Sequence, residues 1–171
     1  PTHNFRADIA PGCPIGIVLE RRNAEGRKTR QVSEAIWWLL LDSMSLTPNY
    51  KYASFNSRSD KLDAPRSAAY TPFRESRCII PASAFVEGLG DKKTYHKIEL
   101  EDAAIAFGGV YKQYVNRETG ESVLGASIIT LPPLIPQWQH IHPKSLPLML
   151  DMNNKELIDK WLDPGFDRVE E

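Results

Sequence analysis

The stretch AIAFGGVYKQYVNRETGESVLGASIIT, residues 104–130, decides the fold. Its two apolar ends flank the polar segment NRETG at 116–120, whose composition is typical of a turn. The stretch therefore predicts two antiparallel strands, at 104–114 and 122–130, that pair across this turn.

Further strands are expected on both sides of this pair. A short β-branched run at 15–19 leads into the charged stretch 20–30, where NAEG at 23–26 indicates the turn of a hairpin. Residues 94–100 alternate polar and apolar side chains, which predicts the second strand of another hairpin across the turn 88–93. The remaining strands are expected at 35–41, at 77–85 with an edge or bulge at Pro81, and at 146–150.

Two helices complete the expected secondary structure. Residues 61–70 fit a helix with Pro65 in its first turn, because an interior proline would break it. Residues 153–162 fit an amphipathic helix. The apolar face of that helix consists of Leu157, Ile158 and Trp161. The sum is an α+β fold, a β-rich single domain over residues 1–171.

The composition bounds the class of protein. With 171 residues and 42% hydrophobic content, the chain is long enough to bury one core. Lys and Arg number 21 against 22 Asp and Glu, so the net charge is -1 and nucleic-acid binding would need a local basic patch. No apolar run reaches the ~18 residues of a membrane span. Cys13 and Cys78 show no CxxC spacing, which favours reduced thiols in a cytoplasmic protein without a zinc site.

Asn56 and Arg58 form the first candidate site, within the polar segment 54–59. In an extended chain, residues two apart project from the same face, so an amide and a guanidinium would meet one ligand. The guanidinium fork fits phosphate oxygens, and an amide can read a base edge or a sugar oxygen. The alternative is that Arg58 pairs with Asp60 on the surface while Asn56 caps a turn, and spacing alone favours this alternative.

Glu87 is the second candidate. It closes the apolar run 77–87 and precedes the turn glycine Gly88. Partial burial at such a position disfavours the ionised carboxylate and suits a proton donor or acceptor. An ordinary exposed turn glutamate is the alternative, and it is favoured as long as Glu87 is considered alone.

His142 is the third candidate, placed directly before Pro143 and an apolar strand. Imidazole titrates near neutral pH, so a histidine held in this way can shuttle a proton or polarise a carbonyl. His140 and His142 lack a third Cys, Asp or His in an obvious pattern, so we expect no metal and no cofactor. Cys13 begins an apolar strand, a place more typical of an inert buried thiol than of a nucleophile.

The order of these motifs resembles that of the SOS response-associated peptidase (SRAP) family. The family pattern runs from Tyr-Asn-x-Ala-Pro through Trp-Gly, Asn-Ala-Arg-x-Glu and Arg-Cys-x-x-Pro-x-x-Gly-Phe-x-Glu-Trp to Ile-His-x-Arg-Met-Pro. The matching segments are DIAPG at 8–12, WW at 37–38, NSRSD at 56–60, RCIIPASAFVE at 77–87 and IHPKSLP at 141–147. The chain departs from the pattern at Trp38 and Ala84, where the family has Gly, and at Gly88, where it has Trp.

The resemblance implies a SRAP fold, with curved antiparallel sheets forming a barrel-like core, peripheral helices and a positively charged cleft for single-stranded DNA. In the family, an N-terminal cysteine exposed by self-cleavage closes a thiazolidine ring with the ring-opened aldehyde of an abasic site. Carried over, Asn56 and Arg58 would bind the DNA, and Glu87 and His142 would be catalytic residues that move protons. The family's Met-Cys-Gly start is absent here, so either segments are missing at both ends or this member has lost the nucleophile.

The resemblance leaves two main functions open. The first is a monomeric DNA-damage response protein, bacterial, cytoplasmic and nucleoid-associated, with autopeptidase and abasic-site crosslinking or lyase activity. The alternative is a non-catalytic member that binds single-stranded DNA by stacking bases on Trp37, Trp38 or Trp138. Because Trp37 and Trp38 would point to opposite faces of a strand, at least one is expected in the core. A peptidase that acts on other proteins is a third, weaker option.

Overall fold

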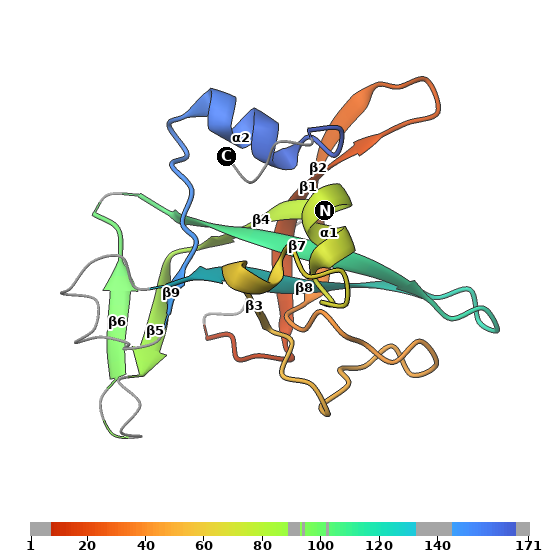
Figure 1. The fold of residues 1–171 in the computed structure, drawn as a ribbon, viewed down its shortest axis with the longest axis horizontal. Helices are drawn as coiled ribbons and strands as arrows, with labels where there is room; N and C mark the ends of the chain where they lie inside the picture. Colours follow the sequence, from red (N-terminus) through yellow and green to blue (C-terminus); the bar gives the residue numbers. More distant parts are fainter. Residues whose placement is uncertain (1–7, 89–92, 94, 102, 133–144, 167–171) are drawn as a thin grey trace.

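The computed structural model describes residues 8–88, 93, 95–101, 103–132 and 145–166. The strands are β1 (Pro14–Arg22), β2 (Lys28–Ile36), β3 (Asn56–Arg58), β4 (Arg77–Ala82), β5 (Ala84–Gly88), β6 (Tyr95–Glu99), β7 (Ile105–Val115), β8 (Ser122–Leu131) and β9 (Leu146–Pro147). The helical elements are the 3-10 turn η1 (Ser59–Lys61) and the α-helices α1 (Tyr70–Glu75) and α2 (Lys155–Leu162) (Figure 1). Strands thus dominate the described chain.

Five strands close into a ring. Their order is β2-β1-β4-β7-β8, and β8 returns to β2 through the parallel pair of Gly125 with Ile36. Glycine is required at this closure, because a Cβ on Gly125 would lie 2.5 Å from the carbonyl oxygen of Trp38. β3 and β9 pair with β8, while β5 and β6 form a separate two-stranded sheet (Figure 1). The expected β-rich fold with a barrel-like core and few helices is confirmed.

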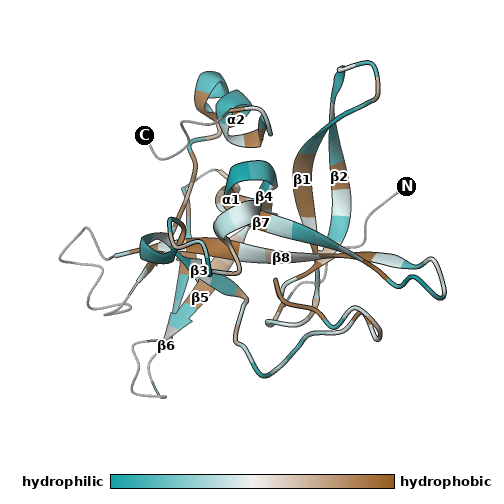
Figure 2. Cartoon of the chain, turned by 45° about the vertical axis from the view of Figure 1, so that its right-hand side comes forward, coloured by the Kyte–Doolittle hydropathy of each residue, from teal (hydrophilic) through white to brown (hydrophobic). Residues whose placement is uncertain are grey.

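Alternate residues of the ring strands enter two apolar clusters. The interior cluster takes side chains from every ring strand, namely Ile15, Ile17, Leu19, Ala35, Cys78, Ile80, Ile105, Phe107, Leu124, Ala126 and Ile128. Residues between them, such as Ile79, Val110 and Ile129, enter an outer cluster with α1 and α2. Both faces of β4, β7 and β8 are therefore buried, which explains their nearly continuous apolar sequences. Figure 2 shows the hydrophobic stretch of β1 and the hydrophilic tip of the β1–β2 hairpin.

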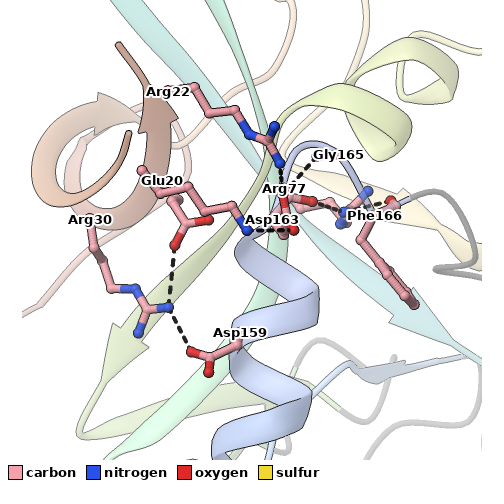
Figure 3. A network of polar contacts seen from close by, with 9 residues as sticks. Glu20, Arg22, Arg30, Arg77, Asp159, Asp163, Gly165 and Phe166 are labelled. Atoms are coloured by element: carbon pink, nitrogen blue, oxygen red, sulfur yellow. Dashed lines mark hydrogen bonds and ion pairs between the residues drawn. The ribbon is translucent and has the colours of Figure 1, made fainter. Parts of the chain in front are cut away.

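Arg77 links both helices to the sheet, and Figure 3 shows it beside Asp163 and Phe166, which follow α2. It begins β4 and is only 3% exposed. Its N–H groups donate hydrogen bonds to five backbone carbonyl oxygens, those of Trp161 (2.8 Å), Phe73 (2.8 Å), Arg74 (3.2 Å), Asp163 (2.6 Å) and Phe166 (3.1 Å). Burial lowers the pKa of Arg77, although the negative charge of Asp163 opposes this shift. All five N–H donors of the guanidinium are paired, which explains how the core tolerates this cation.

Ion pairs join α2 to the β1–β2 hairpin (Figure 3). Asp163 accepts hydrogen bonds from Lys28 Nζ at 2.8 Å and from Arg22 Nη2 at 3.2 Å. Burial alone would raise the pKa of Asp163, but these donors and a backbone N–H outweigh it and lower the pKa to about 2. Arg30 adds a hydrogen bond to Asp159 at 2.9 Å. The hairpin is thereby held over the end of α2.

The two expected hairpins and the strand pair of residues 104–130 are confirmed, with β1 pairing β2, β5 pairing β6 and β7 pairing β8.

The prediction of a strand at 35–41 is wrong for the residues after Ile36, where β2 ends. The chain turns there, with the Trp38 N–H donating to the Ile36 carbonyl at 2.7 Å, and only an isolated bridge between Leu41 and Pro48 follows. This run is apolar because it packs at the closure of the ring, where Trp38 and Leu41 are buried.

The helix expected at 61–70 is also wrong. Residues 62–69 form turns, and α1 begins only at Tyr70. Pro65 disfavours a helical conformation of the residue before it. The apolar residues Leu62 and Ala69 are buried in the outer cluster, so tertiary packing explains a pattern that resembled helical periodicity.

Three smaller differences concern element boundaries and faces. The strand expected at 77–85 divides at Ser83 into β4 and β5, and the last strand shrinks to β9 with an isolated bridge from Met149 to Phe107. The expected amphipathic helix is confirmed as α2, but Leu157, which was expected on its apolar face, is 37% exposed.

Among the described residues, no helix is long and apolar enough to cross a membrane.

Candidate functional site

Asn56 and Arg58 project from the same exposed side of β3, as their spacing predicts. Both are exposed, whereas Ser57 between them is buried. The strand is held against β8 in parallel register, with Asn56 opposite Ile128 and Arg58 opposite Thr130. A short extended segment on the ring therefore presents an amide and a guanidinium together.

The expected surface pairing of Arg58 is also present. Arg58 Nη2 lies 2.6 Å from Asp60 Oδ2, and the two side chains are 69% and 54% exposed. Such exposed ion pairs contribute about 0–1 kcal/mol, so a phosphate can compete for the guanidinium. Asn56 lies in β3 and does not cap the turn η1 that follows, because the N-cap position of η1 is Arg58.

Glu87 is the last residue but one of β5, and it is half-buried. Two residues before it, the Phe85 ring packs edge-on against Phe107 of the ring interior, with centroids 5.3 Å apart. This contact holds the two-stranded sheet against one end of the ring. Directly across from Glu87 in β6 is His96.

The third candidate, His142, lies outside the described residues. The strand β9, which follows it in the sequence, is described. Pro147 of β9 pairs with Thr130 of β8, and Arg58 of β3 pairs with the same Thr130. Strand β3, which carries the first candidate, and strand β9 therefore both pair with the same residue of β8.

The two tryptophans of the candidate site differ in exposure. Trp38 is buried, 7% exposed, and its Nε1 donates to the Asn49 carbonyl at 3.1 Å. Trp37 is half-buried, and its Nε1 donates to the Phe55 carbonyl at 2.9 Å. The expectation that at least one of them belongs to the core is confirmed. Trp138 lies outside the described residues.

An aromatic row that sequence reasoning missed runs from these tryptophans to the surface. Trp37 contacts Phe55 at 6.0 Å between ring centroids, Phe55 contacts Trp38 at 5.6 Å, and Trp38 contacts Tyr50 at 5.1 Å. Tyr50 is 72% exposed and Tyr52 is 51% exposed. The signal for it was the aromatic, basic, aromatic order of Tyr50-Lys51-Tyr52, which is typical of a base-stacking surface.

The two cysteines differ in burial. Cys78 is fully buried in the ring, and this burial raises the pKa of its thiol well above the ordinary value. Cys13 is half-buried at the start of β1. The described residues contain no group of three His, Cys, Asp or Glu side chains arranged to hold a metal ion.

Solved structures share this architecture. A protein from Bacteroides thetaiotaomicron aligns with a TM-score of 0.60 at 24% identity, over 81% of this chain and 61% of that chain. A protein from Bordetella bronchiseptica aligns with a TM-score of 0.67 at 18% identity, over 88% of this chain and 74% of that chain. These likenesses define the class of fold, a closed five-stranded ring with short flanking elements.

Sequence comparison then defines the family. Residues 1–171 match the family SOS response associated peptidase (SRAP), and the chain belongs to it. It is 30% identical over 131 residues to the abasic site processing protein YobE of Bacillus subtilis, covering 74% of this chain and 57% of that protein. The abasic site processing protein YoqW of the same organism matches at 30% over 131 residues, 74% of this chain and 55% of that protein. The chain thus spans a little over half the length of these relatives.

Proposed function

We propose that this protein recognises abasic sites in single-stranded DNA, as a monomer in the bacterial cytoplasm and at the nucleoid. The observation that carries the proposal is the paired exposure of Asn56 and Arg58 on β3. The guanidinium binds a phosphate next to the lesion, and the amide binds an oxygen of the exposed sugar. The names of the relatives YobE and YoqW, which process abasic sites, support this assignment.

Local charge and aromatic surface support the same partner. Although the whole chain carries a net charge of -1, residues 51–61 hold three basic side chains, Lys51, Arg58 and Lys61, and one acidic side chain, Asp60. The three basic residues are exposed. Tyr50 and Tyr52 offer rings on which neighbouring bases stack, and the half-buried Trp37 contacts Phe55, the residue before Asn56. Buried Trp38 acts indirectly, since it packs against Tyr50.

The proposed chemistry is covalent. The α-amine of an N-terminal cysteine, exposed by self-cleavage, attacks the ring-opened aldehyde and loses water to form an imine. The thiolate then adds to the imine carbon, and a proton passes to the nitrogen, which closes a thiazolidine ring. Glu87 and His142 move these protons between nitrogen, sulfur and the departing water. Cys13 and Cys78 lie inside the chain and have no free α-amine, so neither is this nucleophile.

Intact-mass spectrometry of the protein with its natural N-terminus tests the proposal. The protein is mixed with single-stranded DNA that carries either an aldehydic abasic site or a tetrahydrofuran analogue, which cannot open to an aldehyde. The proposal predicts an adduct of protein plus DNA minus water with the first oligonucleotide and none with the second.

The same experiment decides a second candidate, a non-catalytic member that only binds DNA. This candidate is favoured by the exposed rings of Tyr50 and Tyr52, which can stack on bases without a covalent step. Binding to both oligonucleotides without an adduct would support it. Absence of both binding and adduct would contradict the two candidates together.

A further inference from the structure

His96 lies directly opposite Glu87 in the antiparallel pair of β5 and β6. Side chains of directly opposed residues emerge on the same face, with Cβ atoms about 4.5–5.5 Å apart. An imidazole therefore stands next to the carboxylate that the proposed function uses. No motif of the sequence pointed to it, since His96 and Glu87 are separated along the chain by the turn of the hairpin.

The face that carries this pair turns toward the ring. The next opposed pair on the same face is Phe85 with Ile98, and the Phe85 ring packs against Phe107. The other face is open to solvent, because Val86 and Tyr95 on it are each 63% exposed. Glu87 and His96 are accordingly both half-buried.

The ring nitrogen Nε2 of His96 is buried and has no hydrogen-bond partner. A buried polar nitrogen without a hydrogen bond costs free energy. When the nitrogen carries the proton, a hydrogen bond to a nearby acceptor removes this cost. The neighbours of His96 in sequence, Tyr95 and Lys97, belong to the opposite, solvent-facing side, where Lys97 pairs with Glu99 at 3.0 Å. Glu87 is the carboxylate that shares the face of His96.

We infer that His96 is a positioning residue for Glu87. A rotation of the imidazole about its side-chain bonds brings Nε2–H to the Glu87 carboxylate, which accepts the hydrogen bond. A carboxylate has about four lone-pair positions, so this bond adds to the interactions that Glu87 already makes. It orients the carboxylate and holds it as an acceptor beside the bound sugar. The functional consequence rests on the proposed function, whereas the contact itself does not.

Nitrogen-15 NMR of the histidine side chains, at one fixed pH without DNA, tests the contact. The inference predicts that the neutral His96 ring carries its proton on Nε2 and that this resonance shifts in Glu87→Gln. Lys97→Gln, on the solvent face of the same strand, is the matched control and should leave the resonance in place. Two results would overturn the inference. One is a neutral ring whose proton is on Nδ1 and not on Nε2, and the other is an Nε2 chemical shift that is the same in wild type and Glu87→Gln.

Kinetics then test the consequence in the protein with its natural N-terminus. His96→Phe should slow adduct formation at saturating abasic DNA by about tenfold to a hundredfold, with DNA affinity changed less than about twofold. His96→Gln, whose amide can donate in place of Nε2, should restore most of the rate. Equal rates in wild type and His96→Phe would overturn the positioning role. Failure of the wild type itself to bind or react would count against the proposed function instead, and the NMR result would still decide the contact.

Discussion

The hydroxyl groups of Ser57 and Ser127 form a hydrogen bond of 2.7 Å between β3 and β8. Both residues are buried, Ser127 completely. Because Ser57 stands between Asn56 and Arg58, this bond fixes the strand whose outer side carries the proposed DNA contacts. The placement of the site thus depends on a polar pair inside the fold.

Substitution of Ser57 by Ala should destabilise the protein by about 1–3 kcal/mol, because the buried hydroxyl of Ser127 loses its partner. The double variant S57A/S127A should recover part of this free energy, since it leaves no unpaired hydroxyl. Urea unfolding of both single variants and of the double variant measures the difference. If the single and double variants unfold at the same urea concentration as wild type, the bond does not stabilise β3.

Arg77→Met should cost about 3–5 kcal/mol of stability, because five backbone carbonyl oxygens lose their donor in the interior. Arg66→Met is the matched control: Arg66 is exposed, so its loss should stay within about 0.5 kcal/mol. Thermal unfolding followed by circular dichroism compares the two. Similar melting temperatures for both variants would show that Arg77 does not hold the helices.

Asp163 should make the fold sensitive to acid. Its pKa in the folded protein is about 2, below the ordinary value of 3.8. A carboxylate with a lowered folded pKa stabilises the protein above the unfolded pKa, and this contribution disappears as the pH falls toward the folded pKa. The stability advantage of wild type over Asp163→Asn should therefore be full at pH 5 and shrink between about pH 4 and pH 2. A difference in unfolding free energy that stays constant over this range would contradict the assignment.

Tyr50→Ala and Tyr52→Ala should each weaken binding of single-stranded DNA by about 5-fold to 100-fold, the equivalent of about 1–3 kcal/mol for one stacked base. Both rings are largely exposed, so their removal should leave stability nearly unchanged. Val32→Ala, an exposed apolar residue on β2, is the control for general surface effects. Fluorescence anisotropy with a labelled oligonucleotide gives the affinities. Unchanged affinity in both tyrosine variants would place the DNA elsewhere.

Local signals in the sequence predicted a large part of the fold. The turns at 23–26 and 116–120 identified the β1–β2 and β7–β8 pairs, because a turn between two apolar runs constrains the register of its own hairpin. The closure of the ring could not be predicted in this way. It depends on a contact of Gly125 with the distant backbone at Trp38, and the apolar run beside it looked like a strand.

The same distinction applies to the candidate site. The period-two spacing of Asn56 and Arg58 predicted their shared face correctly, since that property is local to an extended chain. The opposition of Glu87 and His96 could not be predicted, because it depends on the register across a hairpin. The exposure of Tyr50 likewise results from how Trp38 packs beneath it.

Recognition of an abasic site in single-stranded DNA is the proposed role of β3. Its most direct test is the affinity of wild type, Asn56→Ala and Arg58→Ala for two single-stranded oligonucleotides that differ by one tetrahydrofuran abasic site. We expect that wild type prefers the abasic oligonucleotide and that Asn56→Ala loses this preference. Arg58→Ala should bind both oligonucleotides more weakly and with a smaller salt dependence. Equal affinity of wild type for the two oligonucleotides, with no effect of either substitution, would contradict it.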